Sequence, residues 1–159
     1  MATAWKSTFP RLAVLPLLVV LLATISLSCS SEPVTAIHLE ADGSGDYPSL
    51  DKAVQKISAG GTITLGAGTY RLSAPVEIDK PISLLGAGID QTTIAATTEY
   101  YVVRFSGEGS FVLQGLTAQI QGGGEAAVVR VDSGEIAFSD CRFKGDGSNG
   151  PGLQVIANA

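Results

Sequence analysis

Short runs of alternating apolar and polar residues fill most of the chain, and the same runs return at a nearly fixed spacing. The run VVRF at Val102–Phe105 returns as VVRV at Val128–Val131. Phe111–Leu113 returns in the same way as Ile136–Phe138. A fixed period of roughly 20–50 residues is typical of solenoid proteins, in which each unit buries its apolar face by stacking on the next. The repeat therefore argues against a sandwich or an ordinary barrel.

Alternation along each run assigns its side chains to a face, because successive residues of a strand point to opposite sides. We expect Glu77, Arg104, Arg130 and Gln154 to point outward in one ladder. The inward ladders are Val76 and Ile78, Val103 and Phe105, Val129 and Val131, Leu153 and Val155; and Ile82 and Leu84, Phe111 and Leu113, Ile136 and Phe138. The step from Leu84 to Leu113 is longer than the step from Leu113 to Phe138, which indicates an insertion, and we place it at Asp90–Tyr101.

One segment near the start of the repeat has helical periodicity instead. Apolar residues recur at Leu50, Ala53, Val54 and Ile57, which is the i, i+3, i+4, i+7 pattern of an amphipathic helix. Ser49 is a suitable N-cap and two glycines follow Ala59, so we expect a helix over Ser49–Ala59. A short helix with one apolar stripe should cover the open N-terminal end of the solenoid.

The opening of the repeat resembles a known family. DGSGDY at Asp42–Tyr47, followed by LDKAV at Leu50–Val54, is similar to the start of pectin methylesterases and related extracellular proteins of the pectin-lyase-like superfamily. GAGTY at Gly66–Tyr70 and PISLLGAG at Pro81–Gly88 look like the turns and strand that follow. The resemblance implies an all-β fold, a right-handed parallel β-helix with one short N-terminal capping helix. The same opening precedes lyases, esterases and hydrolases, so it implies little about activity.

The segment Met1–Ser28 has the features of a secretory signal. Lys6 and Arg11 precede the uncharged run Leu12–Ser31, and small residues surround Cys29. The segment resembles a bacterial lipoprotein leader, which implies lipidation of Cys29 and a membrane anchor there. A plain cleaved signal and an uncleaved anchor stay open as alternatives. We therefore assign residues 1–28 to a signal peptide, 29–35 to a tether and 36–159 to the N-terminal part of a β-helix domain, truncated at its C-terminus, in an extracytoplasmic protein.

Charge and cysteine content exclude several classes of partner. All 15 acidic residues but only 8 of the 10 basic ones lie after residue 28, which leaves that part at −7. Such an acidic surface repels phosphates, and we therefore expect no nucleic-acid partner. Two cysteines cannot form a disulfide framework, and one histidine beside them does not suggest a zinc site. No cofactor is evident, although outward Asp132, Asp140 and Asp146 leave calcium binding open.

Candidate binding residues lie on the outer positions of the repeat. Arg104 and Arg130 could hold the carboxylates of an acidic sugar, since a guanidinium binds a carboxylate through two parallel hydrogen bonds. Tyr100 and Tyr101 could stack on a sugar ring, and Asp140 should point outward beside Arg142. Each has a structural alternative: a charge ladder with Glu77, local packing, or a turn. Cys141 aligns with Leu116 and is expected in the core.

No catalytic residue can be carried over from the family, because its Asp, Gln and Arg motifs do not occur here. The hypothesis we favour is a surface protein that binds polysaccharide without cleaving it, with acidic polysaccharides among the candidate ligands. One alternative is the N-terminal part of a carbohydrate lyase or esterase whose active site lies beyond residue 159. The other is a structural scaffold that binds no glycan.

Overall fold

The computed structural model describes residues 32–122, 127–145, 147 and 153–155, the last range by its backbone alone. The predicted signal peptide and Cys29 lie outside these residues, as does Asp146. The elements are β1 (Ala36–Leu39), α2 (Leu50–Lys56), β2 (Thr62–Leu65), β3 (Gly68–Leu72), β4 (Val76–Ile78), β5 (Ser83–Gly86), β6 (Thr92–Ala96), β7 (Tyr101–Phe105), β8 (Ser110–Ile120), β9 (Ala127–Val131), β10 (Glu135–Lys144) and β11 (Leu153–Val155).

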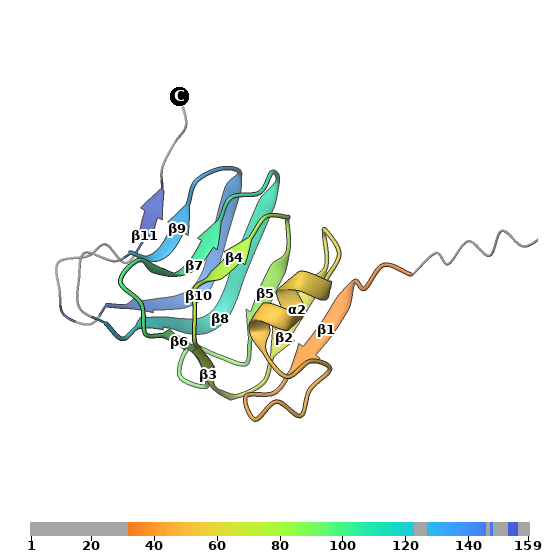
Figure 1. Cartoon of the computed structure of the whole chain (residues 1–159), viewed down its shortest axis with the longest axis horizontal. Coiled ribbons are helices and arrows are strands. Elements are labelled where there is room, and N and C mark those ends of the chain that lie inside the picture. The colour runs from red at the N-terminus through yellow and green to blue at the C-terminus, as the bar shows by residue number, and fades with distance from the viewer. Residues whose placement is uncertain (1–31, 123–126, 146, 148–152, 156–159) are drawn as a thin grey trace, which may run out of the picture. The chain divides into compact units, whose positions relative to one another are not determined.

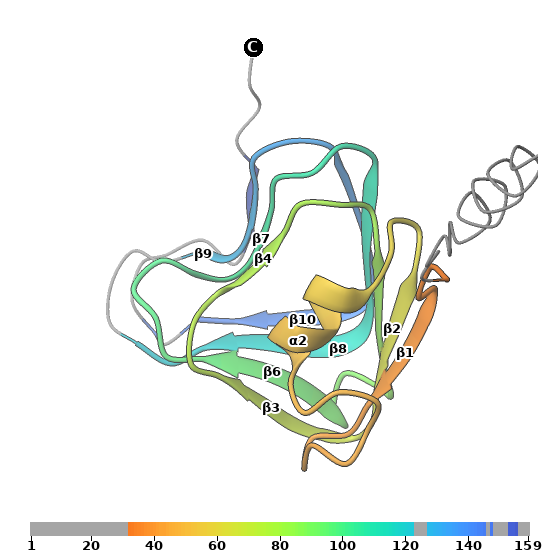
Figure 2. The same cartoon turned by 45° about the vertical axis from the view of Figure 1, so that its right-hand side comes forward.

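The strands wind into a parallel β-helix of about four turns, which confirms the predicted fold class (Figures 1 and 2). Strands β4, β7, β9 and β11 pair in that spatial order and form one face. A second face contains β1, β2, β5 and the first halves of β8 and β10. The third face contains β3, β6 and the second halves of β8 and β10. All these pairings are parallel, so each coil lies directly on the one before it.

The register follows the predicted repeat. Arg104 pairs with Arg130, and Ile136 pairs with Phe111, as the repeated runs predict. The inward residues of the first three coils are buried, and those of β10 are half-buried. Cys141 pairs with Leu116 and packs against the core, as expected from the alignment. The residues assigned to the inward ladders therefore pack inward wherever the structure describes their side chains. Val102 and Val128, which strict alternation would turn outward, are buried as well.

The insertion lies mostly before the expected segment. Leu85 pairs with Gln114, and Thr93 pairs with Thr117. The segment from Leu85 to Thr93 is therefore longer than the segment from Gln114 to Thr117 that lies beside it in the next coil. The additional residues belong to the turn that joins β5 to β6. The segment Asp90–Tyr101 instead contains β6, a regular strand that pairs with both β3 and β8. The placement at Asp90–Tyr101 was wrong because a long step between coils gives the size of an insertion and not its position.

Helix α2 covers the N-terminal end and is shorter than predicted. It spans Leu50–Lys56, buries Leu50, Ala53 and Val54, and contacts β4 and β1. Ser49 precedes it with extended backbone but makes no side-chain cap hydrogen bond, so the predicted cap is not formed. Ile57 adopts extended backbone and ends the helix before the two glycines. Among the described residues, no helix is both long and apolar enough to cross a membrane.

The loop after β1 folds back over the free edge of that strand. The His38 N–H donates to Asp46 Oδ2 at 2.7 Å, and the Asp46 N–H donates to the His38 carbonyl at 2.8 Å. Gly45 lies so close that a Cβ there would meet the His38 carbonyl oxygen at 2.6 Å. The DGSGDY motif thus satisfies backbone groups that an exposed edge strand would otherwise offer to another chain.

Candidate functional site

The predicted outward ladder is present on the face formed by β4, β7 and β9. Glu77 pairs with Arg104 and Arg104 pairs with Arg130 in the backbone register. Gln154 continues this register, but its side chain lies outside the described residues. We call Glu77, Arg104 and Arg130 the outer ladder. Its rungs are about 4.8 Å apart, which is the usual spacing of neighbouring strands.

Asp132, just after β9, joins the two arginines of the outer ladder. Arg104 donates from Nε to Asp132 Oδ2 at 2.6 Å, and its Nη2 lies 2.5 Å from the same oxygen. Arg130 donates from Nε to Asp132 Oδ1 at 2.7 Å. The Asp132 side chain is 15% exposed, against 35% for each arginine. One carboxylate therefore compensates two neighbouring positive charges and fixes both side chains.

Tyr101 bonds Glu77 at the other end of the outer ladder. We call the outer ladder together with Asp132 and Tyr101 the cluster. The Tyr101 hydroxyl donates to Glu77 Oε1 at 2.5 Å, and Arg104 Nη1 donates to Glu77 Oε2 at 3.4 Å. Tyr101 is thus engaged in the cluster and is not free to stack on a ligand. Tyr100, by contrast, is 69% exposed, and its carbonyl accepts the Ala127 N–H at 3.0 Å. Of the two predicted stacking residues, only Tyr100 presents its ring to solvent.

Hydrogen bonding within the cluster shifts three pKa values. The hydrogen bond from Arg130 lowers the pKa of Asp132, and the contacts with Arg104 lower it further. The hydrogen bond to Asp132 raises the pKa of Arg104. The hydrogen bond to Glu77 raises the pKa of Tyr101, whose phenol stays neutral. Two arginines and two carboxylates give the cluster no formal net charge at neutral pH.

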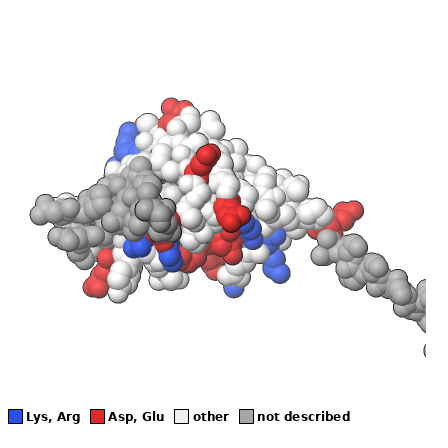
Figure 3. Space-filling view, turned by 90° about the horizontal axis from the view of Figure 1, so that it is seen from above, with Lys and Arg blue, Asp and Glu red and all other residues white. Residues whose placement is uncertain are grey.

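Arg130 has donors that the cluster does not use. Arg104 directs all three guanidinium nitrogens at Asp132 and Glu77. For Arg130 the recorded contact within the described part of the chain is through Nε alone. Its two terminal NH₂ groups can therefore donate in parallel to a carboxylate or to two neighbouring hydroxyls. In Figure 3, acidic and basic side chains lie intermixed on a largely uncharged surface.

Asp140 is not brought to this cluster. It lies at the bend in β10, between the other two faces, opposite the bend at Gly115 in β8. Its φ of 51° is close to the 66° of Gly115, so Asp140 has the left-handed conformation that Asp tolerates better than most residues. A shallow cavity of about 510 Å³ there is lined by Leu85–Ile89, Gln114, Gly115 and Asp140.

Cys141 is not an activated thiol, and the described acids do not gather into a metal centre. Burial raises the pKa of the Cys141 thiol, which holds it in the less nucleophilic protonated form. No group of three or more His, Cys, Asp or Glu side chains arranged to hold a metal ion occurs among the described residues.

Sequence reasoning treated Asp132 only as a possible acid and missed that it pairs with both arginines. A signal for this role was available. Asp132 follows Arg130 by two residues, and residues two apart in an extended chain share a face. The contact with Arg104 was visible only through the stacking of the coils.

The fold resembles those of carbohydrate-active enzymes. No protein-family profile matches the chain. It is 28% identical to pectinesterase 31 of Arabidopsis thaliana over 137 residues, which cover 69% of this chain and 43% of that enzyme. The chain thus spans less than half the length of this relative.

Two solved structures were also similar. A PL6-family alginate lyase, AlyGC, superposes with a TM-score of 0.53 at 15% identity over 79% of this chain and 20% of that one. ORF18 of Geobacillus virus E2 superposes with a TM-score of 0.49 at 21% identity, over 65% of this chain and 25% of that one. Together with the parallel coils, the pectinesterase and the alginate lyase show that this chain has a pectin-lyase-like parallel β-helix.

Proposed function

We propose that this chain is an extracytoplasmic, lipid-anchored protein that binds polysaccharide on the outer face of β4, β7 and β9 without cleaving it. The observation that carries the proposal is the contact between Asp132 and Arg130 of the outer ladder. Asp132 holds the Arg130 side chain in place through Nε, and the two terminal nitrogens of Arg130 stay available to a ligand. A donor pair held in this way loses little side-chain entropy when it binds a ligand.

The exposed ring of Tyr100 supports the same proposal. Tyrosine offers a large rigid surface at low entropic cost, and an exposed aromatic ring beside hydrogen-bond donors suits the apolar and polar faces of a sugar. The backbone of Tyr100 is fixed by its bond to Ala127 at the start of β9. Tyr100 directly precedes β7, the strand that contains Arg104.

A glycan array followed by calorimetric titration of the hits tests the proposal. We expect Arg130→Ala and Tyr100→Ala each to weaken glycan binding by about tenfold, the cost of losing one or two good contacts. Arg142→Ala is the matched control, because Arg142 pairs with Asp90 at a corner away from the outer ladder. Glycan binding that both test variants leave intact would remove this face from the proposal, and the absence of any binding would favour the scaffold hypothesis.

The lipid anchor has a separate test. Labelled palmitate should be incorporated into the chain expressed in a bacterium, and Cys29→Ala should abolish the labelling and release the protein from the membrane fraction. Retention in that fraction without any label would instead support an uncleaved anchor.

The similarity to a pectinesterase favours a second candidate, the N-terminal part of a carbohydrate esterase or lyase. This candidate requires catalytic residues on coils that belong to a longer gene product. Methanol release from methylated pectin, or formation of unsaturated uronates, by the product of the intact gene would support it over simple binding.

A further inference from the structure

Three adjoining cavities follow helix α2 and lead to the outer ladder. The first, of about 320 Å³, lies between the loop before α2 and the chain from β3 to β4. The second, of about 260 Å³, shares Asp51 and Pro75 with the first. The third, of about 280 Å³, shares Val54, Gln55 and Glu77 with the second. We call them together the helix groove, and Glu77 belongs to both the groove and the outer ladder.

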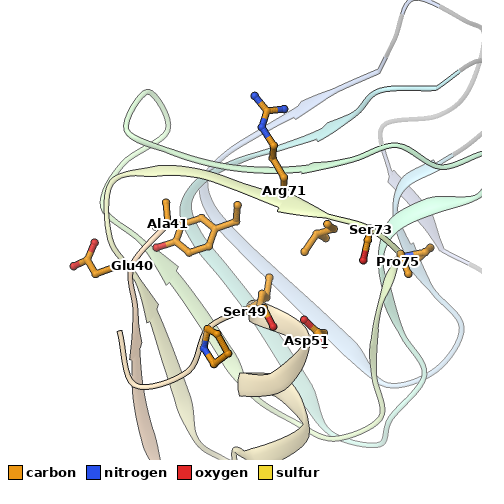
Figure 4. A pocket seen from close by; sticks show the side chains of 12 residues that line it. Glu40, Ala41, Ser49, Asp51, Arg71, Ser73 and Pro75 are labelled. Atoms are coloured by element: carbon orange, nitrogen blue, oxygen red, sulfur yellow. The ribbon is translucent and has the colours of Figure 1, made fainter. Parts of the chain in front are cut away.

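The first cavity has a polar lining with few charges. Figure 4 shows Ser49, Asp51 and Ser73 around the space, while the side chains of Glu40 and Arg71 point away from it. Tyr70 also lines this cavity, and its hydroxyl is already bonded to the Leu39 carbonyl at 2.8 Å. Hydroxyls and one carboxylate therefore remain for a ligand.

The edge of β4 adds backbone groups to the groove. Ser106 donates its N–H to the Ile78 carbonyl at 2.9 Å, so the Ile78 backbone groups face β7. Because these directions alternate along a strand, the N–H and carbonyl of Glu77 face the opposite edge, toward α2. Glu77 lines both the second and the third cavity, so this edge of β4 borders the groove. A donor and an acceptor side by side suit a hydroxyl, which can accept from one and donate to the other.

The charges around the groove select against an acidic ligand. Asp51, Glu77 and Asp79 line the second and third cavities, with Lys80 the one basic side chain among their lining residues. Carboxylates accept strong hydrogen bonds from sugar hydroxyls, but they repel the carboxylates of a uronate polymer. The outer ladder and Asp132 together carry no formal net charge, so they do not offset this repulsion.

We propose that the helix groove binds an uncharged glycan chain whose other end lies on the outer ladder. This inference rests on the proposed polysaccharide binding and specifies the class of sugar and the path of the chain. The polymer would run from Arg130 past Glu77 and along α2 toward Asp51. A peptide strand fits the same edge poorly, because β4 is a very short strand and Pro75, just before it, has no N–H to donate.

Titration of the purified full chain with two hexasaccharide classes tests the choice of sugar. The probes are uncharged gluco-, manno- and galacto-hexaoses, and hexagalacturonate for comparison. We expect at least one uncharged hexaose to bind more tightly than hexagalacturonate, with an affinity that changes less than twofold between low and high salt, because no ionic contact is screened. Tighter, salt-sensitive binding of hexagalacturonate would overturn the inference while leaving polysaccharide binding standing.

Variants of α2 test the path of the chain. Gln55 is exposed and lines the second and third cavities, so Gln55→Ala should weaken hexaose binding about fivefold and leave trisaccharide binding on the outer ladder unchanged. Lys52→Ala is the matched control on the same helix, since Lys52 is exposed and lines none of these cavities. Circular dichroism confirms that both variants keep the fold.

The outcomes separate the two proposals. Weaker binding at every length in Arg130→Ala, together with a weakening in Gln55→Ala that is confined to the longer glycans, supports both. An unchanged hexaose affinity in Gln55→Ala, or an equal loss in Lys52→Ala, overturns the groove alone. Failure of every hexasaccharide to bind overturns polysaccharide binding itself and the groove with it. A further outcome is that the protein binds an unstructured peptide and no glycan, and that Gln55→Ala weakens the peptide binding. This result would overturn the glycan proposal and assign the groove to peptides.

Discussion

At the scale of single residues, Asp132 is the side chain that makes the outer ladder possible. Parallel pairing places Arg104 directly beside Arg130, and like charges on neighbouring strands destabilise a sheet. Asp132 gives one carboxylate oxygen to each arginine. It therefore acts as a positioning residue for the donors that we assign to glycan binding.

Replacing Asp132 with Asn should destabilise the protein. The substitution keeps the size of the side chain but removes the charge that compensates two arginines, so we expect a loss of about 1–2 kcal/mol in the free energy of unfolding. Urea denaturation measures it. Asp90→Asn is the control, because Asp90 is 75% exposed in its pair with Arg142 and should change stability by less than about 0.5 kcal/mol. Equal effects of the two variants would contradict the role given to Asp132.

The stabilisation from Asp132 should also depend on pH. Its pKa is lowered in the folded state from the ordinary value of 3.8, mainly by the hydrogen bond from Arg130. A lowered pKa stabilises the folded state above the unfolded value, and this stabilisation disappears as the pH falls through the folded value. The difference in unfolding free energy between the natural chain and Asp132→Asn should therefore be constant from about pH 5 to pH 7 and shrink below the ordinary pKa of 3.8. A difference that stays constant far into the acid range would exclude the charge as its source.

At the scale of elements, the resemblance motif has a structural purpose that the sequence did not reveal. The Gly, Asp and Ser residues of the loop after β1 favour turns. That its Asp46 returns to bond His38 depends on the path of the whole loop between them, which the turn preferences of single residues do not give. The motif that carries the family resemblance thus protects the first strand.

Asp46→Ala should expose the edge of β1. The His38 N–H would lose its side-chain acceptor, and the strand could pair with another copy of the chain. We expect concentration-dependent self-association in sedimentation velocity runs. Asp42→Ala is the control from the same loop, because Asp42 bonds only Ser44 within the loop among its recorded contacts. Self-association in Asp42→Ala as strong as in Asp46→Ala would point to general loosening of the loop instead.

Element positions were predictable where a period governs them and not where a turn does. The pairing of Arg104 with Arg130 follows from repeated VVR runs, and the buried faces follow from alternation. The insertion was misplaced because turn length leaves no periodic trace. The helix end was misjudged because the chain leaves helical backbone at Ile57, where that side chain joins the core, before the glycines are reached.

At the scale of the whole molecule, the stacked coils explain both what the sequence revealed and what it concealed. The repeat indicated a solenoid because each coil packs on its neighbours in the same way. The candidate site could be located only in part, since contacts such as Arg104 to Asp132 join residues on successive coils that lie far apart in sequence. The groove beside α2 could not be inferred at all, because it exists only where the helix meets the first coil.

The same stacking predicts that the coils contribute unequally to stability. Substitutions at two phenylalanines in different coils can test this. Phe105 is fully buried and stacks on Phe111 with ring centroids 5.4 Å apart. Phe138, in β10, is half-buried and contacts Phe143 edge to face at 5.1 Å. Because a cavity costs more where neighbours surround it, Phe105→Ala should lower the unfolding free energy by about 3–5 kcal/mol and Phe138→Ala by roughly half as much. Hydrogen exchange should likewise be slower in β7 than in β10, since a solenoid opens most easily where a coil has fewer packed neighbours. Equal losses in the two variants, with equal exchange rates, would mean that the coils unfold as one unit, and the nearest-neighbour description of this β-helix would then be wrong.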